Sequence, residues 1–253
     1  MNDDFITDAE ARIVAFLRSA RPELMQFFGK VDYTSKADRT VVTHLDKQLE
    51  QQLRELLRTI DPGIGIEGEE FAQEGSRKTY WLVDPIDGTE QFIRGIPSCR
   101  TQICLIDNGQ VIWSLIYFFV RDEFYLARRG KGAVCNGDKI QIFYRPLNRS
   151  WIDVTSALSD SEFTAKIIAL RPHIANFGGF HDLSLMFTGK IDGLISFMGN
   201  GSSWDYAPRS LLYQEAGAKI ANFGSDSYDY TNPSFLVAHP QNFDKLMSIL
   251  SRS

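Results

Sequence analysis

The segment Asp84–Thr89 (DPIDGT) holds two carboxylates three residues apart, around a proline, at the end of the apolar run Tyr80–Val83. Two like charges about 5 Å apart repel by roughly 0.8 kcal/mol in water, and by about four times as much at the effective dielectric of a protein surface. The pattern therefore indicates either solvated turn residues or a site in which a cation lies between the carboxylates.

Further acidic residues lie where an apolar segment meets a turn, namely Asp46, the pair Glu69 and Glu70, and Asp205. Singly, each has a plain structural explanation, because Asp is a good helix N-cap and is common in turns. Together with Asp84 and its neighbour they form an all-oxygen set of ligands, which is the set that Mg²⁺ prefers. The sequence therefore predicts a magnesium site assembled from four distant segments.

The spacing around the proline suits two metal ions. A proline restricts the preceding residue to extended backbone, so the strand is expected to continue to Asp84. Asp84 could then bridge two ions, Asp87 could bind one of them, and the Ile86 carbonyl could be a neutral ligand. A helix beginning at Gly88 and Thr89 would offer N–H groups to a phosphate oxyanion. Two ions roughly 3.5–4 Å apart can activate a water and stabilise a leaving oxygen, which predicts hydrolysis of a phosphate ester.

Apolar spacing predicts two amphipathic helices that would cover a sheet. The first is expected to begin at Thr7, which forms a capping-box pattern with Glu10. The second is expected at 46–60. Four strands are predicted between residues 79 and 127, two of them joined by a hairpin at Asn108-Gly109.

The C-terminal part of the sequence has a mixed pattern, and residues 140–180 are the least legible. Helices first, then a meander of strands, then mixed elements favour a layered α+β fold over an alternating parallel α/β fold. We expect an N-terminal α+β lobe at 1–145, which carries most of the metal ligands, and a C-terminal α/β lobe at 146–253, which contributes Asp205 and the residues for substrate specificity. Helices are expected at 181–188, 205–216 and after Pro240, and strands at 193–197 and 234–238.

The segment Gly63–Gly68 satisfies the pattern G-x-G-x-x-G of dinucleotide-binding loops. That interpretation needs a strand before the glycines and a helix after them. Here an amphipathic helix precedes the glycines, and the neighbouring glutamates would repel phosphate. The glutamates are therefore more informative than the glycines.

Composition narrows the class of protein. The chain has 253 residues and a formal net charge of −5, which argues against a broad electrostatic surface for nucleic acid. The start lacks the basic and apolar regions of a secretory signal, and the apolar run Val111–Val120 is too short to cross a bilayer as a helix. Cys99, Cys104 and Cys135 fit neither a disulfide framework nor a zinc site. We expect a cytoplasmic protein with no nucleic-acid or membrane partner.

At the acidic segments the chain closely resembles the inositol monophosphatase family of Mg²⁺-dependent, lithium-sensitive phosphomonoesterases. The resemblance implies a layered α-β-α-β-α sandwich of the inositol monophosphatase and fructose-1,6-bisphosphatase type, usually a homodimer, with two or three Mg²⁺ ions in each active site. The matching segments are Gly68–Glu70, Trp81–Thr89 with Phe92, Trp204-Asp205 and Gln214–Gly217.

The family pattern implies a role for each metal ligand. Glu69, Asp84 and the Ile86 carbonyl would hold the activating Mg²⁺. Asp84, Asp87 and Asp205 would hold a second ion near the leaving oxygen. A third, weaker ion would use Glu69 and waters.

The same pattern implies the groups that act on water and phosphate. Thr89, with Asp46 behind it, would orient the attacking water, and Glu69 belongs to the same catalytic set. The backbone N–H groups of Gly88 and Thr89 would hold the phosphate.

The sequence departs from inositol-specific members of the family before the Trp-Asp pair. Those members carry an acidic residue six or seven positions earlier, whereas the segment 197–203 has none. Phe197 and Met198 are therefore the expected specificity residues. The segments 36–46 and 92–95 look more like bacterial histidinol-phosphate phosphatases.

The predicted function is hydrolysis of a small phosphate ester by metal-activated water, with an inositol-1-phosphate-like polyol phosphate as the leading substrate. Histidinol phosphate, a sugar bisphosphate and a 3′-phosphoadenosine phosphate are alternatives within the same chemistry. A catalytically silent binding protein of the same fold is the alternative from another class, but none of the acidic ligands is missing.

Overall fold

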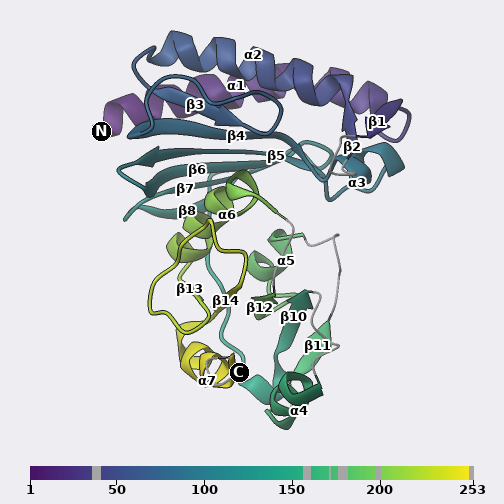
Figure 1. Ribbon diagram of the computed structural model, residues 1–253, viewed down its shortest axis with the longest axis vertical. Helices are drawn as coiled ribbons and strands as arrows, with labels where there is room; N and C mark the ends of the chain where they lie inside the picture. Colours follow the sequence, from purple (N-terminus) through teal and green to yellow (C-terminus); the bar gives the residue numbers. More distant parts are fainter. Residues whose placement is uncertain (36–40, 156–160, 171, 176–181, 198–200, 251–253) are drawn as a thin grey trace. The chain divides into compact units, whose positions relative to one another are not determined.

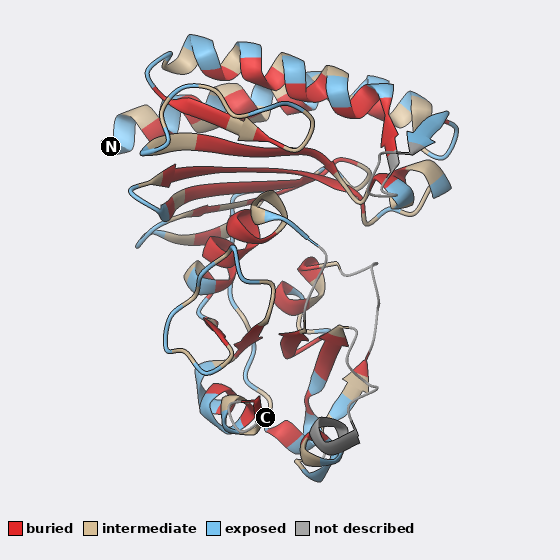
Figure 2. Cartoon of the chain, viewed as in Figure 1, coloured by how far each residue is buried: buried red, intermediate tan, exposed pale blue. Residues whose placement is uncertain are grey.

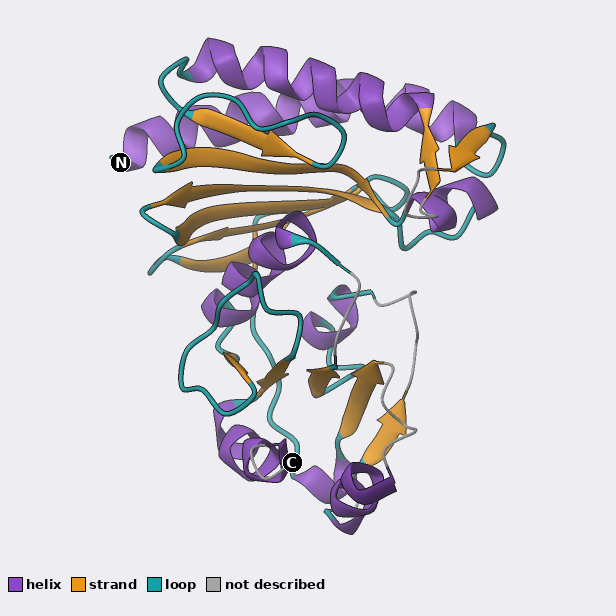
Figure 3. Cartoon of the chain, in the orientation of Figure 1, coloured by secondary structure: helices purple, strands orange, loops and turns teal. Residues whose placement is uncertain are grey.

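The computed structural model (Figure 1) describes residues 1–35, 41–155, 161–170, 172–175, 182–197 and 201–250. The chain forms two compact units. The first unit is Met1–Arg129 with Val134–Gly137, and the second unit is Gly130–Ala133 with Asp138–Ser253. The sequence placed a lobe boundary at residue 145, whereas the chain passes from one unit to the other between residues 129 and 138. Each unit combines helices with a sheet (Figure 3), which confirms the α+β class.

Helix α1 (Asp3–Phe27) begins four residues before the expected start at Thr7. Asn2 is the N-cap, and its side chain accepts a hydrogen bond from the Phe5 N–H at 2.8 Å. The Thr7 hydroxyl instead donates to the Asp3 carbonyl inside the helix. The predicted capping box is wrong because an earlier cap and an acidic first turn stabilise the helix N-terminus.

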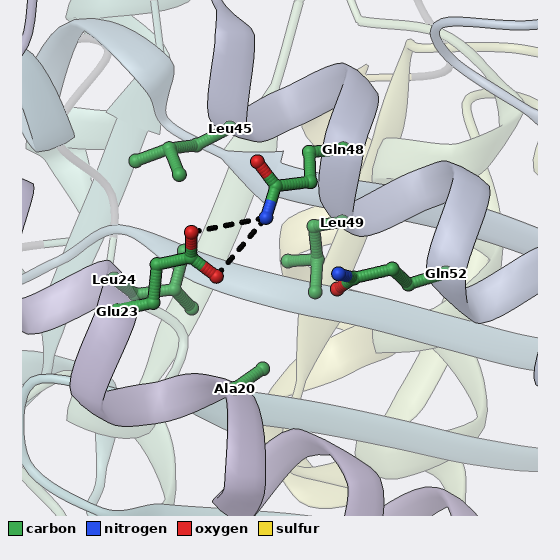
Figure 4. Close-up of a pocket in the computed structure, with 7 residues that line it drawn as sticks. All are labelled: Ala20, Glu23, Leu24, Leu45, Gln48, Leu49 and Gln52. Carbon is green, nitrogen blue, oxygen red and sulfur yellow. Dashed lines mark hydrogen bonds between the residues drawn. The ribbon is translucent and has the colours of Figure 1, made fainter.

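Helix α2 (His44–Ile60) lies beside α1 on the same face of the large sheet (Figure 1). Its N-cap is Thr43, so the helix begins two residues before the expected start. Leu49, Leu53 and Leu57 form a leucine stripe along this helix that is buried in the core against the sheet. Between the two helices, the Gln48 amide donates to both carboxylate oxygens of Glu23 at 3.0 Å (Figure 4). Among the described residues, no helix combines the length and the hydropathy needed to span a bilayer.

The large sheet has the strand order β3-β4-β5-β6-β7-β8-β9. Strand β3 runs parallel to β4, while β4 to β7 form an antiparallel meander, which confirms the four predicted strands. The hairpin at Asn108-Gly109 is also confirmed, since both residues have the positive φ of a tight hairpin turn. The bounds are β3 Gly65–Gly68, β4 Thr79–Asp87, β5 Arg100–Asp107, β6 Gln110–Phe118, β7 Glu123–Arg128, β8 Gly132–Cys135 and β9 Asp138–Ile140.

Two short strands and one short helix complete the first unit. Strands β1 (Tyr33–Ser35) and β2 (Val41–Thr43) pair in antiparallel fashion, and helix α3 (Thr89–Arg94) follows β4. The core lies between the sheet and the helices α1 and α2, and Figure 2 shows the buried stripe along both helices. Alternate residues of each strand enter this core, as a pleated sheet requires. On the strands the core includes Trp81, Val83, Ile103, Leu105, Trp113, Leu115 and Tyr117.

The second unit contains a five-stranded sheet of order β11-β10-β12-β14-β13. Helices α4 and α7 pack against its core through Ile167, Phe243 and Leu246. The predicted strands at 193–197 and 234–238 and the helices after residue 205 and after Pro240 are confirmed, while the short helix expected at 181–188 covers 184–187. The bounds are η1 Leu147–Arg149, β10 Trp151–Thr155, α4 Ser161–Ala169, β11 His173–Ala175, α5 Ser184–Phe187, β12 Gly193–Ser196, α6 Ser203–Glu215, β13 Lys219–Asn222, β14 Phe235–Ala238 and α7 Pro240–Leu250.

The three cysteines are free thiols. Cys99 and Cys104 are completely buried, which confirms that they behave as small hydrophobic residues, whereas Cys135 is half-buried. Burial raises the pKa of Cys99 to about 12. The reactive thiolate is therefore scarce at neutral pH, and burial also blocks reagents.

We predict that iodoacetamide at pH 8 alkylates Cys135 alone in the folded protein and all three cysteines after unfolding, as read by peptide mass spectrometry. Cys135→Ser should then remove the labelling of the folded chain. The pKa of Cys99 is higher in the folded chain than in the unfolded chain. The protonated thiol therefore contributes fully to stability below the unfolded pKa, and this contribution declines as the pH rises toward 12. Alkylation of Cys99 in the folded chain at the rate of Cys135 would contradict this burial.

Candidate metal centre

Strand β4 presents Asp84 and Asp87 on the same face of the sheet. In a regular strand, residues three apart point to opposite faces. Here Asp84 lies opposite Gln102 and Asp87 lies opposite Arg100, so three steps along β4 match two steps along β5. This extra residue is a β-bulge, and it contains Pro85, which has no N–H to give to the sheet. Both carboxylates therefore share a face with Arg100 and Gln102.

The hydrophobic core confirms the change of side at the bulge. Val83, before the bulge, and Ile86, after it, both belong to the core beneath α1 and α2. Asp84 and Asp87 therefore both face away from these helices. The Thr101 hydroxyl donates to the Pro85 carbonyl at 2.8 Å and so satisfies an acceptor that the bulge displaces.

Glu69 lies beside these residues at the end of β3. Gly68 is paired with Val83 of β4, and the Glu69 N–H donates to the Val83 carbonyl at 3.2 Å. Because β3 and β4 are parallel, Glu69 leaves its strand at the level of Asp84. Asp84 is 1% exposed, and Glu69 and Asp87 are half-buried. Carboxylate oxygens that are shielded from water are suitable ligands for a hard cation such as Mg²⁺.

A buried ion pair on α2 fixes the turn that carries Glu69. The Glu50 carboxylate accepts from Arg54 Nε at 2.8 Å and from the Glu70 N–H at 2.7 Å. Arg54 also donates to the Phe71 carbonyl at 2.8 Å. A Cβ at Gly68 would lie 2.2 Å from a Glu50 oxygen, so glycine is required for this approach. Burial raises the pKa of Glu50, while the bonds from Glu70 and Arg54 act against that shift.

A second buried acid, Asp46, is bonded to Thr89. Asp46 is fully buried at the third position of α2, where one oxygen accepts from the Thr43 N–H at 2.8 Å and from the Thr43 hydroxyl at 2.5 Å. Its other oxygen lies 3.0 Å from the Thr89 hydroxyl, which also lies 3.1 Å from the Ile86 carbonyl. Burial raises the pKa of Asp46, opposed by the hydrogen bonds from Thr43 and Thr89.

The Thr89 hydroxyl has one proton for these two acceptors. Its oxygen also has lone pairs that can accept a hydrogen bond from another group. Gly88 precedes it with φ 82° and ψ 47°, a left-handed conformation that favours glycine and turns the chain from β4 into α3. The structure thus brings Gly88, Thr89 and Asp46 together, as the sequence pattern implied.

The second unit carries the remaining predicted residues. Asp205 is the third residue of α6, and its carboxylate accepts from the Ser202 N–H at 2.5 Å. It therefore has the same position in its helix as Asp46 has in α2. Phe197 follows β12 and packs against Phe223, with ring centroids 4.9 Å apart. Met198 lies outside the described residues.

Four residues of the site were missed from the sequence. Glu50 and Arg54 continue a spacing of four from Asp46 along the buried side of α2, which is a signal that the leucine stripe obscured. Arg100 and Gln102 occupy alternate positions of a predicted strand and so share a face. Arg100 forms an ion pair with Asp87, and Gln102 donates to the same carboxylate.

Crowded carboxylates at the ends of β3 and β4, with a hydroxyl held against a buried acid, are the arrangement of a phosphate-ester hydrolase. The profile of the inositol monophosphatase family matches residues 3–253. The chain belongs to that family and is a phosphatase, which confirms the resemblance seen in the sequence.

Individual relatives cover nearly the whole chain. It is 30% identical over 248 residues to a putative Nus factor SuhB of Neisseria meningitidis, covering 92% of this chain and 94% of the relative. It is 24% identical over 246 residues to a fructose-1,6-bisphosphatase/inositol-1-monophosphatase of Thermotoga maritima, covering 94% of both. A solved IMPase of Thermotoga maritima matches with a TM-score of 0.83 at 22% identity and covers 96% of each chain. The last comparison confirms the fold.

We predict that Glu50→Ala lowers the free energy of unfolding by about 3–5 kcal/mol, because it removes the buried carboxylate that lies 2.8 Å from Arg54 Nε. Replacing both residues by methionine should recover most of that loss. Urea denaturation measures both effects.

Glu90→Ala is the matched control. Glu90 and Arg94 form a pair with the same spacing, but their side chains are 60% and 62% exposed. Its loss should change the free energy of unfolding by less than about 1 kcal/mol. A Glu50→Ala chain as stable as this control would contradict the anchoring role of Glu50.

Proposed function

We propose that this chain is a Mg²⁺-dependent phosphomonoesterase that hydrolyses a small phosphate ester by attack of an activated water. The observation that carries the proposal is the bulge of β4, which presents Asp84 and Asp87 on one face beside Glu69. When bound, the divalent ions would supply an activated water and a stabilised leaving oxygen.

Each ligand has a place in the proposed site. Glu69, Asp84 and the Ile86 carbonyl would hold one ion, and Asp84 and Asp87 would hold another. Asp205 is the ligand that the second unit would supply to that other ion. The presentation of Asp205 at the third position of α6 supports this role, since the helix N-terminus is fixed by a hydrogen bond to that carboxylate. A third ion at Glu69 is part of the same proposal.

The phosphate and the attacking water are held by the start of α3. The N–H groups of Gly88 and Thr89 bind phosphate oxygens, and the left-handed Gly88 allows the close approach. Thr89 accepts a hydrogen bond from the water because its own proton is directed at Asp46 or Ile86. Asp46 is fixed by Thr43 and thereby fixes the orientation of Thr89.

The proposed substrate is an inositol-1-phosphate-like polyol phosphate. The name of the Thermotoga maritima relative, a fructose-1,6-bisphosphatase/inositol-1-monophosphatase, supports this class. Segment 197–203 carries no acid that would bind substrate hydroxyls, and Phe197 packs with Phe223 against the core of the second unit, which counts against inositol itself. Histidinol phosphate is the alternative, favoured by the sequence at 92–95, followed by sugar bisphosphates and 3′-phosphoadenosine phosphates.

Assembly and location complete the proposal. We expect a homodimer in the cytoplasm, with a small phosphate ester as the only required partner. Membership of the inositol monophosphatase family supports the dimer. Both stay predictions.

We predict phosphate release from at least one member of a panel of these esters in the presence of Mg²⁺, and its loss on addition of EDTA. Asp84→Asn should lower kcat by about a thousandfold, because it removes a ligand that both ions share. A phosphate-release assay with each ester measures both effects.

Asp107→Asn is the control for this experiment. Asp107 lies at the far end of β5, where it accepts from the Thr79 hydroxyl at 2.7 Å, and its loss should leave kcat unchanged within about threefold. Hydrolysis that persists in EDTA or in the Asp84→Asn chain would falsify the proposed chemistry.

A further inference from the structure

The carboxylate of Asp87 is already engaged by two side chains of β5. Arg100 forms an ion pair with Asp87 Oδ2, and the Gln102 amide donates to the same oxygen. The side chains of Arg100 and Asp87 are only 6% and 14% exposed. The pair is therefore largely removed from water. Its electrostatic effect is stronger than that of a surface pair, which water and salt screen.

Other contacts hold the guanidinium in this position. Arg100 Nη1 donates to the Ser98 carbonyl at 3.1 Å, and the guanidinium carbon lies 5.6 Å from the centroid of the Phe118 ring. Gln102 is fully buried. Arg100 is therefore part of the packed interior and not a surface side chain that reaches in from solvent.

The pairing also follows from the backbone. Arg100 lies directly opposite Asp87 in the ladder of β4 and β5, on the side of the bulge where both face away from α1 and α2. Directly opposite side chains in a sheet lie close together. The same bulge that brings Asp87 to the face of Asp84 thus brings it against a permanent cation.

A guanidinium stays protonated throughout the physiological pH range and fits a carboxylate closely. It neutralises the charge that a divalent ion would otherwise neutralise, and it repels a second cation at the same oxygen. Asp84 and Glu69 offer carboxylate oxygens on the same side of the sheet, which is the type of ligand that Mg²⁺ prefers.

We propose that Arg100, held by the Ser98 carbonyl and the Phe118 ring, is a resident counter-charge at Asp87 that weakens the binding of the second divalent ion. This inference rests on the proposed function and refines it. The chain binds one ion tightly through Glu69 and Asp84, and a second ion binds at Asp87 only when it displaces the guanidinium. Arg100 is a positioning residue, since it acts through Asp87.

The test is Mn²⁺ binding to the full chain without substrate, followed by the electron paramagnetic resonance signal of free Mn²⁺. The wild-type chain should bind one ion tightly and a second at least about tenfold more weakly. Arg100→Met keeps the apolar stem over Phe118 but removes the charge, and it should tighten the second ion by about tenfold or more.

Two further variants act as controls. Arg94→Met removes an exposed arginine from the same unit and should reproduce the wild-type isotherm. Arg100→Lys keeps the charge and should leave the second ion weak. If Arg100→Met fails to fold, as judged by circular dichroism, Arg100→Gln serves as the neutral variant.

A wild-type chain that binds two ions with equal affinity overturns the inference without any variant. A binding isotherm that Arg100→Met leaves unchanged also overturns the inference. In that case the proposed metal site still stands if Asp84→Asn abolishes binding of the tight ion. Absence of Mn²⁺ binding in the wild type and in every variant would overturn both the inference and the metal-dependent function.

Discussion

The bulge between Asp84 and Asp87 is the constraint on which the site depends. Without the extra residue, the pleat of β4 would direct one of these carboxylates into the core beneath α1 and α2. A proline in an inner strand is costly unless its missing N–H falls at an irregular position. Pro85 therefore belongs to the device that makes the site, and Thr101 satisfies the carbonyl that the bulge displaces.

Burying carboxylates in this way is unfavourable, and the first unit offsets the loss of hydration with fixed hydrogen-bond and ion-pair partners. Glu50 is held by Arg54 and by a backbone N–H, Asp46 is held by Thr43 and Thr89, and Asp87 is held by Arg100. Each partner is supplied by an element already required by the fold. These bonds fix the carboxylates in position as well as stabilising them, so the surroundings of the site are rigid before any ligand binds.

The sequence predicted the parts of this site that depend on local chemistry. The segment Asp84–Thr89, the helix over 46–60 and the four strands between 79 and 127 follow from propensity and periodicity, and the structure confirms them. The side to which each carboxylate points could not be predicted, because it depends on the register of pairing with β5, which begins 13 residues after Asp87. Arg100 and Glu50 were missed for the same reason, since their partners are defined by tertiary contacts. The cap at Asn2 was missed because two capping patterns compete within one turn and a half.

The number of cations at such a site is set by all positive charges in it, whether they are ions or side chains. The three carboxylates of the first unit, Glu69, Asp84 and Asp87, carry more negative charge than one divalent ion neutralises. Arg100 changes that balance, because it neutralises one carboxylate with a charge that the chain itself carries and that does not dissociate. In such a phosphatase the charge of Asp87 is neutralised at any concentration of free metal. The second ion would then need a higher concentration of free metal to bind, because it must displace the guanidinium.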